Sequence, residues 1–344
     1  MNSSKKYLYV EVVALPVWLG SFFIYKKIYT KTWLYLQYSI FFFIIDIYDE
    51  VYMKRIGDRK DAKKVRNLDG LHNVMIDIKP ERCDSDVYMN KEIDITNLIK
   101  YVEKYKKEHP DNKITYFHAF TMAFAKTIYN KPLLNRFIAN RTFYDRNDVI
   151  IAFVAKIAFE EDSEEVMINI KVDKDDTIFT LRDKITKRVN KIRNSKKGDK
   201  KENTNNIVDV VGKMPKLIRM IVTGTLKFLD KHGWLPESIT KDNLYYSSVI
   251  LSNLGNFKIG SIYHNIVNFG TSSIIATMGQ IHKSKIIDEN GKEKIIDVCD
   301  FGVNMDERIA DGYYFAKSIK LLEYILDNPK LLEEKADERI KFDD

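Results

Sequence analysis

The stretch NMDERIADGYYFAKSIK, residues 304–320, joins an apolar, strand-like segment to a helix-period pattern. Between the two lie Asp306, Glu307 and Arg308, followed by Asp311-Gly312. Charges beside a core destabilise a fold unless they pair with each other or take part in chemistry. The stretch therefore predicts either an internal ion-pair cluster or a working acid or base. Glu307 is the residue for which these two interpretations differ.

The segments that flank this stretch predict an α/β fold with a mixed sheet flanked by helices. Asn290-Gly291, upstream of the stretch, is a strong hairpin signal between two strands. Further strands are expected at residues 71–78, 141–146, 149–159, 164–172, 246–255 and 272–281. Helices are expected at residues 96–109, 115–130, 177–196, 207–232 (broken around 212–215) and 313–327.

Two of the expected helices have informative sequences. The helix at 96–109 opens with Thr96, a suitable N-cap, and stops at Pro110. The pattern at 115–130 is apolar nearly all round, which predicts a buried helix. His118 lies within it and is expected to be a hydrogen-bonded core histidine.

The N-terminal 50 residues form an apolar extension with two runs, 7–25 and 33–48. The first is close to the ~20 residues that span a bilayer, whereas the second is short. Glu11, Pro16 and Asp46 weaken both, and no small-x-small cleavage site follows. Two interpretations stay open: a cytoplasmic protein whose extension packs on the domain or a partner subunit, or one that contacts a membrane within residues 7–48.

The remaining boundaries follow from composition. Residues 51–70 form a charged connector, residues 71–335 the main domain and residues 336–344 a polar tail. The net charge of +7 resides in Lys-rich loops such as 194–206, which argues against a nucleic-acid partner. Cys83 and Cys299 lie far apart with no CxxC, so we expect no disulfide and no metal site, which fits a reducing cytosol.

Four segments, taken in order, carry a resemblance: KEIDITNLIKYV (91–102), ITYFHAFTMAFAKTIYNKPLLNRFI (114–138), ILSNLGNFKIGSIYHNIVNFGTSSIIATMGQI (250–281) and MDERIADG (305–312). They resemble the E-V-D-V-T-x-L, P-x-L-N, T-I-S-N-L-G and D-H-R-x-x-D-G motifs of the 2-oxo acid dehydrogenase (dihydrolipoamide) acyltransferase catalytic domain. The resemblance covers about residues 90–334 and implies a chloramphenicol acetyltransferase-like fold.

The resemblance also implies a homotrimer with an active-site channel between subunits, open to a coenzyme A thioester and a small acyl acceptor. It makes Ser252 the hydroxyl donor that stabilises the oxyanion from across the interface. It assigns Arg308, Asp311 and Gly312 to the structure of the loop. The family's general base, a histidine, is replaced here by Glu307.

This replacement puts the reaction in question. A glutamate ordinarily has a pKa of about 4.3 and a thiol about 8.5, so proton transfer is uphill by roughly 5–6 kcal/mol. Burial of the carboxyl would narrow the gap. His264, in the segment after the Ser252 loop, is the alternative base. The other histidines, 72, 109, 232 and 282, look like surface residues.

Three functional hypotheses follow. The first is a standalone coenzyme A-dependent acyltransferase, because no lipoyl-like segment or Ala/Pro-rich linker precedes the domain. The second is a catalytically inactive relative that serves as a trimeric binding or scaffold module, with Glu307 paired to Arg308 or to a neighbouring subunit. The third is a membrane-tethered acyltransferase acting on a lipid or wall precursor.

Overall fold

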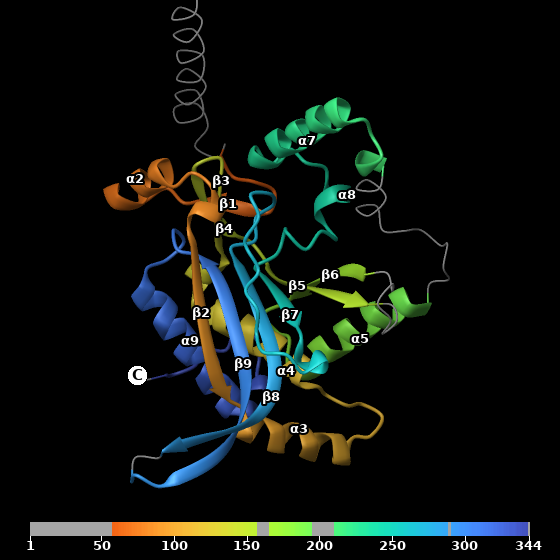
Figure 1. The fold of residues 1–344 in the computed structure, drawn as a ribbon, viewed down its shortest axis with the longest axis vertical. Coiled ribbons are helices and arrows are strands. Elements are labelled where there is room, and N and C mark those ends of the chain that lie inside the picture. The colour runs from red at the N-terminus through yellow and green to blue at the C-terminus, as the bar shows by residue number, and fades with distance from the viewer. Residues whose placement is uncertain (1–56, 157–164, 195–209, 288–289, 343–344) are drawn as a thin grey trace, which may run out of the picture. The chain divides into compact units, whose positions relative to one another are not determined.

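A computed structural model describes residues 57–156, 165–194, 210–287 and 290–342, and its compact unit runs from Arg59 to Asp344. The centre of this unit is a six-stranded sheet in the order β2-β9-β8-β7-β5-β6 (Figure 1). β7 runs parallel to β5 and β8, and the other neighbours are antiparallel, which confirms the predicted mixed sheet. The strands are β2 (Asp86–Asp94), β5 (Val149–Lys156), β6 (Glu165–Val172), β7 (Val249–Asn253), β8 (Ile274–Ile287) and β9 (Glu293–Asp306).

A second, three-stranded antiparallel sheet has the order β1-β4-β3, with bounds Ala62–Lys64, Thr142–Arg146 and Arg136–Ala139. Asn140 and Arg141, both with positive φ, form the two-residue turn between β3 and β4. The sequence did not predict β1 or β3. β1 lies inside the segment predicted as a connector, so the compact unit begins before residue 71.

Four helices pack on one side of the large sheet (Figure 1). They are α3 (Thr96–Glu108), α4 (Tyr116–Asn130), α5 (Ile178–Asn194) and α9 (Gly312–Asp327). α4 is the centre of this layer because residues 118–128 are all buried, as its all-round apolar pattern predicts. The remaining helices are α2 (Gly70–Ile78), α7 (Lys216–Lys231), α8 (Glu237–Thr240), η1 (Arg82–Asp84), η2 (Pro132–Asn135), η3 (Gly255–Phe257) and η4 (Pro329–Glu333).

The N-terminus of α4 is held by a reciprocal cap. The backbone N–H of His118 donates to Thr115 Oγ1, and the backbone N–H of Thr115 donates to His118 Nδ1, both at 3.3 Å. His118 is buried, and this burial, with the nearby Arg182 as a second cause, lowers the pKa of its imidazole to about 4. The predicted hydrogen-bonded core histidine is confirmed.

The cap predicts a specific acid sensitivity. The unfolded chain protonates His118 near pH 6.5, whereas the folded chain resists protonation down to about pH 4. The His118 contribution to stability is therefore complete above pH 6.5 and falls by about 2 kcal/mol between pH 6.5 and pH 5. His118→Gln keeps an acceptor in a Thr-x-x-Gln box but cannot titrate. Urea unfolding at pH 7 and pH 5 should show a smaller acid loss for the variant than for the wild type. Equal losses would contradict this account.

Two local predictions were wrong. Residues 71–78 form helix α2 rather than a strand, because Asp69 caps them by accepting from the His72 N–H at 2.9 Å. Thr96 is the first residue of α3 rather than its N-cap, and its hydroxyl accepts from the Asp297 N–H. The N-cap position that the sequence analysis missed is Asp69 for α2 and Ile95 for α3.

The segment predicted as a polar tail is packed against the domain. Ala336 is fully buried, and the N–H of Ile340 donates to Asn130 Oδ1 at 3.0 Å. Ile340 and Phe342 also pack against the main core. The C-terminal segment up to Phe342 is therefore part of the fold.

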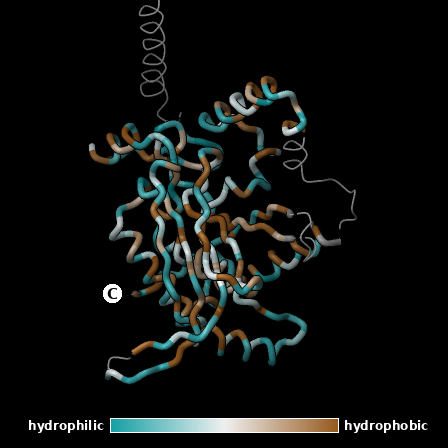
Figure 2. The backbone as a smooth tube through the Cα atoms, viewed as in Figure 1, coloured by the Kyte–Doolittle hydropathy of each residue, from teal (hydrophilic) through white to brown (hydrophobic). Residues whose placement is uncertain are grey.

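Hydropathy along the backbone separates the core from two apolar outer segments (Figure 2). Hydrophobic residues gather where the sheet meets the helical layer, and further hydrophobic positions lie on α2 and α7. Among the described residues, no helix is both long and apolar enough to cross a bilayer. The apolar runs 7–25 and 33–48 lie outside the described residues.

Candidate active site

The loop after β9 is built around a buried ion pair. Arg308 Nε and Nη2 donate to the two carboxylate oxygens of Asp306 at 2.8 and 2.7 Å, and both side chains are almost completely buried. Arg308 Nη1 also donates to the Lys79 carbonyl at 2.7 Å. This two-pronged contact fixes the loop geometry. Arg308 thus joins the loop to the end of α2.

Glu307 lies between these two residues but faces a different partner. Its carboxylate forms an ion pair with Lys79, the C-cap residue of α2. Both side chains are about one third exposed, at 36% and 34%. The Glu307 N–H donates to the Ser85 carbonyl at 2.9 Å, so the backbone is fixed as well. The scaffold hypothesis includes a Glu307–Arg308 ion pair. The structure does not show this pair, because Arg308 forms a bidentate ion pair with Asp306 instead.

Asp311 and Gly312 begin helix α9. The Asp311 carboxylate accepts from the Tyr314 N–H at 2.7 Å and is the N-cap, while Gly312 is the first helical residue. In the described structure Asp306, rather than Asp311, makes the ion pair that holds the loop. Asp311 therefore stabilises the loop by capping the helix that follows it.

Ser252 lies in β7, partly exposed, and its hydroxyl has no hydrogen-bond partner among the described residues. It pairs with Thr277 of β8, which pairs with Gly302 of β9. Glu307 is five positions beyond Gly302, so the two side chains are about 17 Å apart along the strands and about 10 Å across them. One chain alone does not bring Ser252 and Glu307 together. The predicted meeting across a subunit interface stays a prediction.

The segment after Ser252 returns towards Glu307. Gly279 permits this close passage, since a Cβ there would lie 2.5 Å from the Ser261 nitrogen. Further on, the His264 carbonyl accepts from Asn304 Nδ2 at 2.8 Å. Asn304 precedes Glu307 by three residues, so His264, which is exposed, lies at the Glu307 end of the sheet. This position keeps His264 as an alternative base.

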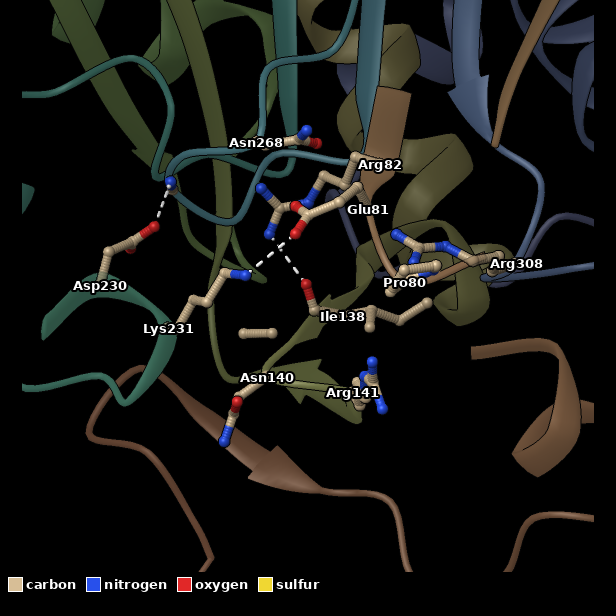
Figure 3. Close-up of a pocket in the computed structure, with 12 residues that line it drawn as sticks. Pro80, Glu81, Arg82, Ile138, Asn140, Arg141, Asp230, Lys231, Asn268 and Arg308 are labelled. Atoms are coloured by element: carbon tan, nitrogen blue, oxygen red, sulfur yellow. Dashed lines mark hydrogen bonds and ion pairs between the residues drawn. The ribbon is translucent and has the colours of Figure 1, made fainter. Parts of the chain in front are cut away.

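A pocket of about 170 Å³ lies beside this loop (Figure 3). Arg82 and Arg308 line it, together with Arg141, Asp230 and Lys231. Cationic side chains outnumber the acidic ones around the cavity. The lining residues are Pro80, Glu81, Arg82, Ile138, Ala139, Asn140, Arg141, Asp230, Lys231, Asn268, Gly270 and Arg308.

Arg82 is the unusual member of the pocket. It is buried, yet its guanidinium donates only to backbone carbonyls, of Ile138 at 2.9 Å and Val267 at 3.3 Å. Its Nε has no partner in the part of the chain that the structure describes. Burial lowers the pKa of its guanidinium, and among the described residues no carboxylate is hydrogen-bonded to it. Nothing in the sequence around Arg82 or Lys79 indicated these roles.

Other candidate residues lie elsewhere. Cys299 is buried in β9 and Cys83 is exposed, and both are free thiols. Among the described residues, Glu92, His282 and Asp300 bring three donor atoms within 4.8 Å of one another. His282 Nε2 lies 3.0 Å from Asp300 Oδ1, and this contact raises the pKa of His282. An ion pair accounts for this cluster.

Comparisons with known proteins agree with this architecture. Residues 235–333 match the family model of the 2-oxoacid dehydrogenases acyltransferase (catalytic domain). The probable dihydrolipoamide acetyltransferase of Listeria monocytogenes 4b F2365 is 17% identical, with 77% of this chain and 95% of that chain covered and a TM-score of 0.50. The dihydrolipoamide acetyltransferase of Azotobacter vinelandii is 15% identical (78% and 94% covered, TM-score 0.52). The cubic core of a pyruvate dehydrogenase multienzyme complex is 15% identical (78% and 94%, TM-score 0.51). No curated protein sequence matches the chain.

The mixed sheet with its one-sided helical layer is the fold of the acyltransferase catalytic cores. The resemblance that the four sequence segments indicated is thereby confirmed. The matched segment, residues 235–333, includes Ser252, His264 and the loop with Glu307. Structural likeness at these identities shows the fold, so the activity needs its own argument.

Proposed function

We propose that the protein is a coenzyme A-dependent acyltransferase that transfers an acyl group from a thioester to a small acceptor. Its site would form between two protomers of a homotrimer. The observation that carries this proposal is the loop after β9, where the buried Asp306–Arg308 pair fixes Glu307 in a partly exposed position beside a cationic pocket. The structurally similar Azotobacter enzyme has a serine, a histidine and an asparagine that were investigated for their role in its catalytic mechanism.

The chemistry assigns a role to each group. A base, Glu307 or His264, takes the proton of the acceptor as the acceptor attacks the thioester carbonyl. The hydroxyl of Ser252 from the adjacent protomer donates a hydrogen bond to the oxyanion that forms. The tetrahedral intermediate then expels the coenzyme A thiolate, which receives the proton from the base. Ser252 suits this role because its hydroxyl has no partner among the described residues.

The pocket supports an anionic substrate. Arg82 is a buried cation that lacks a direct carboxylate partner within the described chain, and Arg141 adds a second charge at the rim. Burying an unpaired charge is unfavourable, and a phosphate group would compensate it with charge-assisted hydrogen bonds. Coenzyme A carries several phosphates, so the pocket fits that part of the donor.

One observation favours the alternative, a non-catalytic trimeric binding module. Lys79 neutralises Glu307 within the same chain, so the carboxylate is already occupied. An enzyme would have to displace this ammonium, or use it to bind the substrate, when the acceptor enters.

An assay of acyl transfer tests the proposal. Protein and acetyl-coenzyme A are incubated with thiol, amine and alcohol acceptors, and the release of coenzyme A is followed chromatographically. This readout avoids thiol reagents, which the exposed Cys83 would consume. We expect acceptor-dependent release that falls by about 10²-fold or more in Glu307→Gln, the usual contribution of a general base. His264→Ala is expected to change the rate by less than tenfold.

The outcomes discriminate the hypotheses. If His264→Ala rather than Glu307→Gln abolishes release, the base is His264 and the enzyme hypothesis stands in that form. If every acceptor gives only the buffer rate, the protein is the binding module. As a folding control, the circular dichroism spectra of both variants should match the spectrum of the wild-type protein.

A further inference from the structure

Within the part of the chain that the structure describes, one apolar face of α7, Lys216–Lys231, is exposed. Leu217, Ile221 and Phe228 share this face and are 75%, 70% and 52% exposed. Ile218 and Met220 widen it, and Trp234, 64% exposed, follows the helix. Scattered exposed apolar residues are common, but a continuous stripe of this kind marks an interaction surface.

The opposite side of α7 is fixed to the domain. Val222, Leu226 and Leu229 are half-buried, and Asp230 is buried. Asp230 accepts from the Tyr246 hydroxyl at 2.5 Å and from the Gly270 N–H at 2.8 Å (Figure 3 shows the latter). These bonds hold the helix in one orientation. The apolar stripe therefore cannot turn inward without breaking them.

The exposed charges on α7 are all positive. Between residues 213 and 232 the only acidic side chain is Asp230, which is buried and fully engaged. Lys213, Lys216, Arg219 and Lys227 are exposed. A second copy of this helix would bring cations against cations, which opposes self-association through this face. An anionic surface would be attracted.

The N-terminal chain enters the domain beside α7. Arg59 Nη1 donates to the Asp230 carbonyl at 3.3 Å, and Arg59 is the first residue of the compact unit. Leu71, Val74 and Ile78 of α2 are also exposed, at the same end of the domain (Figure 1).

We propose that α7 with Trp234 binds the surface of a bilayer that contains anionic lipids. The stripe of Leu217, Ile221 and Phe228 would enter the boundary between headgroups and acyl chains, and the flanking lysines would contact the headgroups. Amphipathic helices with a basic flank bind membranes in this way. Asp230 and Lys231 at the end of α7 line the pocket assigned to the substrate, whereas none of the stripe residues lines it, so the proposed surface differs from the proposed catalytic site.

Quenching of Trp234 by brominated lipid tests the proposal in the full chain. Trp18→Phe/Trp33→Phe leaves Trp234 as the sole tryptophan, so its signal is independent of any anchoring by residues 1–50. With vesicles of phosphatidylcholine and phosphatidylserine, we expect a blue shift and quenching that phosphatidylcholine alone does not give. Lys216→Glu/Lys227→Glu and Leu217→Ser/Ile221→Ser should each weaken the apparent vesicle affinity by roughly tenfold or more.

The matched control is Ile295→Ser, which removes an apolar residue that is 60% exposed on β9. It should leave quenching unchanged, and unaltered thermal unfolding should show that all variants fold. Vesicle co-flotation with an unquenched Trp234 would overturn the proposal, since the N-terminal segment would then be the only anchor. A blue-shifted Trp234 without lipid, reversed by dilution, would also overturn it and indicate a protein partner.

Discussion

Arg308→Met is expected to lower the free energy of unfolding by about 3–5 kcal/mol, the usual effect of removing one member of a buried ion pair. The substitution leaves the Asp306 carboxylate in a site where it has no access to water. It also leaves the Lys79 carbonyl without its donor. Urea unfolding of the wild type and the variant at pH 7 measures the difference.

Two controls separate this explanation from lost packing. Asp306→Asn/Arg308→Met removes both charges, and we expect it to recover a large part of the loss, because breaking a pair is worse than deleting it. Asp145→Asn breaks the Arg136–Asp145 pair, whose carboxylate is 52% exposed, and should change stability by less than about 1 kcal/mol. If the double variant is as unstable as Arg308→Met, buried charge is not the cause.

The elements that the sequence predicted well have their apolar pattern, cap or turn residues within their own stretch of sequence. The buried helix α4 has apolar residues on all sides, and α9 begins at an Asp-Gly pair that caps it. The hairpin between β8 and β9 contains Asn290-Gly291, and Gly291 has the positive φ that such a turn requires. In each case propensity, cap and tertiary packing favour the same structure.

The elements that were missed depend on partners that are distant in sequence. β1 is three residues long and is a strand because β4, some 80 residues later, supplies its hydrogen bonds. Helix α2 exposes Leu71, Val74 and Ile78, so its apolar pattern does not mark a buried face and looked like a strand. Short strands and helices with exposed apolar residues lack a reliable local signal.

In the candidate site, too, the features with a local sequence signal were predicted and those that depend on distant partners were not. The loop with Asp306, Glu307 and Arg308 stood out because clustered charge follows an apolar strand. Its partner Lys79 lies 228 residues away and has no motif of its own. Sequence alone therefore identified the charged loop but not the contact that neutralises Glu307. Arg82 stayed unnoticed for the same reason, since only the fold reveals a buried arginine to which no carboxylate of the described residues is hydrogen-bonded.

Mixing two inactive variants should restore acyl transfer. Ser252→Ala is expected to lower the rate by about 10²–10³-fold and Glu307→Gln by about 10²-fold or more. If each site takes Ser252 from one protomer and Glu307 from the next, co-expression in equal amounts rebuilds an intact site at about one interface in four by random assembly. Activity should therefore return to roughly a quarter of the wild-type value. Different affinity tags on the two chains allow the mixed trimers to be purified; each of these holds one intact interface in three, so the purified fraction should reach roughly a third of the wild-type value.

The physical basis of this expectation is the separation of about 17 Å along the strands between the two side chains of one chain. The control pairs Ser252→Ala with the double variant Ser252→Ala/Glu307→Gln, which can form no intact site and should stay inactive. Mixed trimers that fail to regain activity would contradict a shared site, and so would a wild-type protein that is monomeric and active. Either result would place the catalytic groups within one chain, where Glu307 could then act only with residues near its own loop, such as Lys79 and His264.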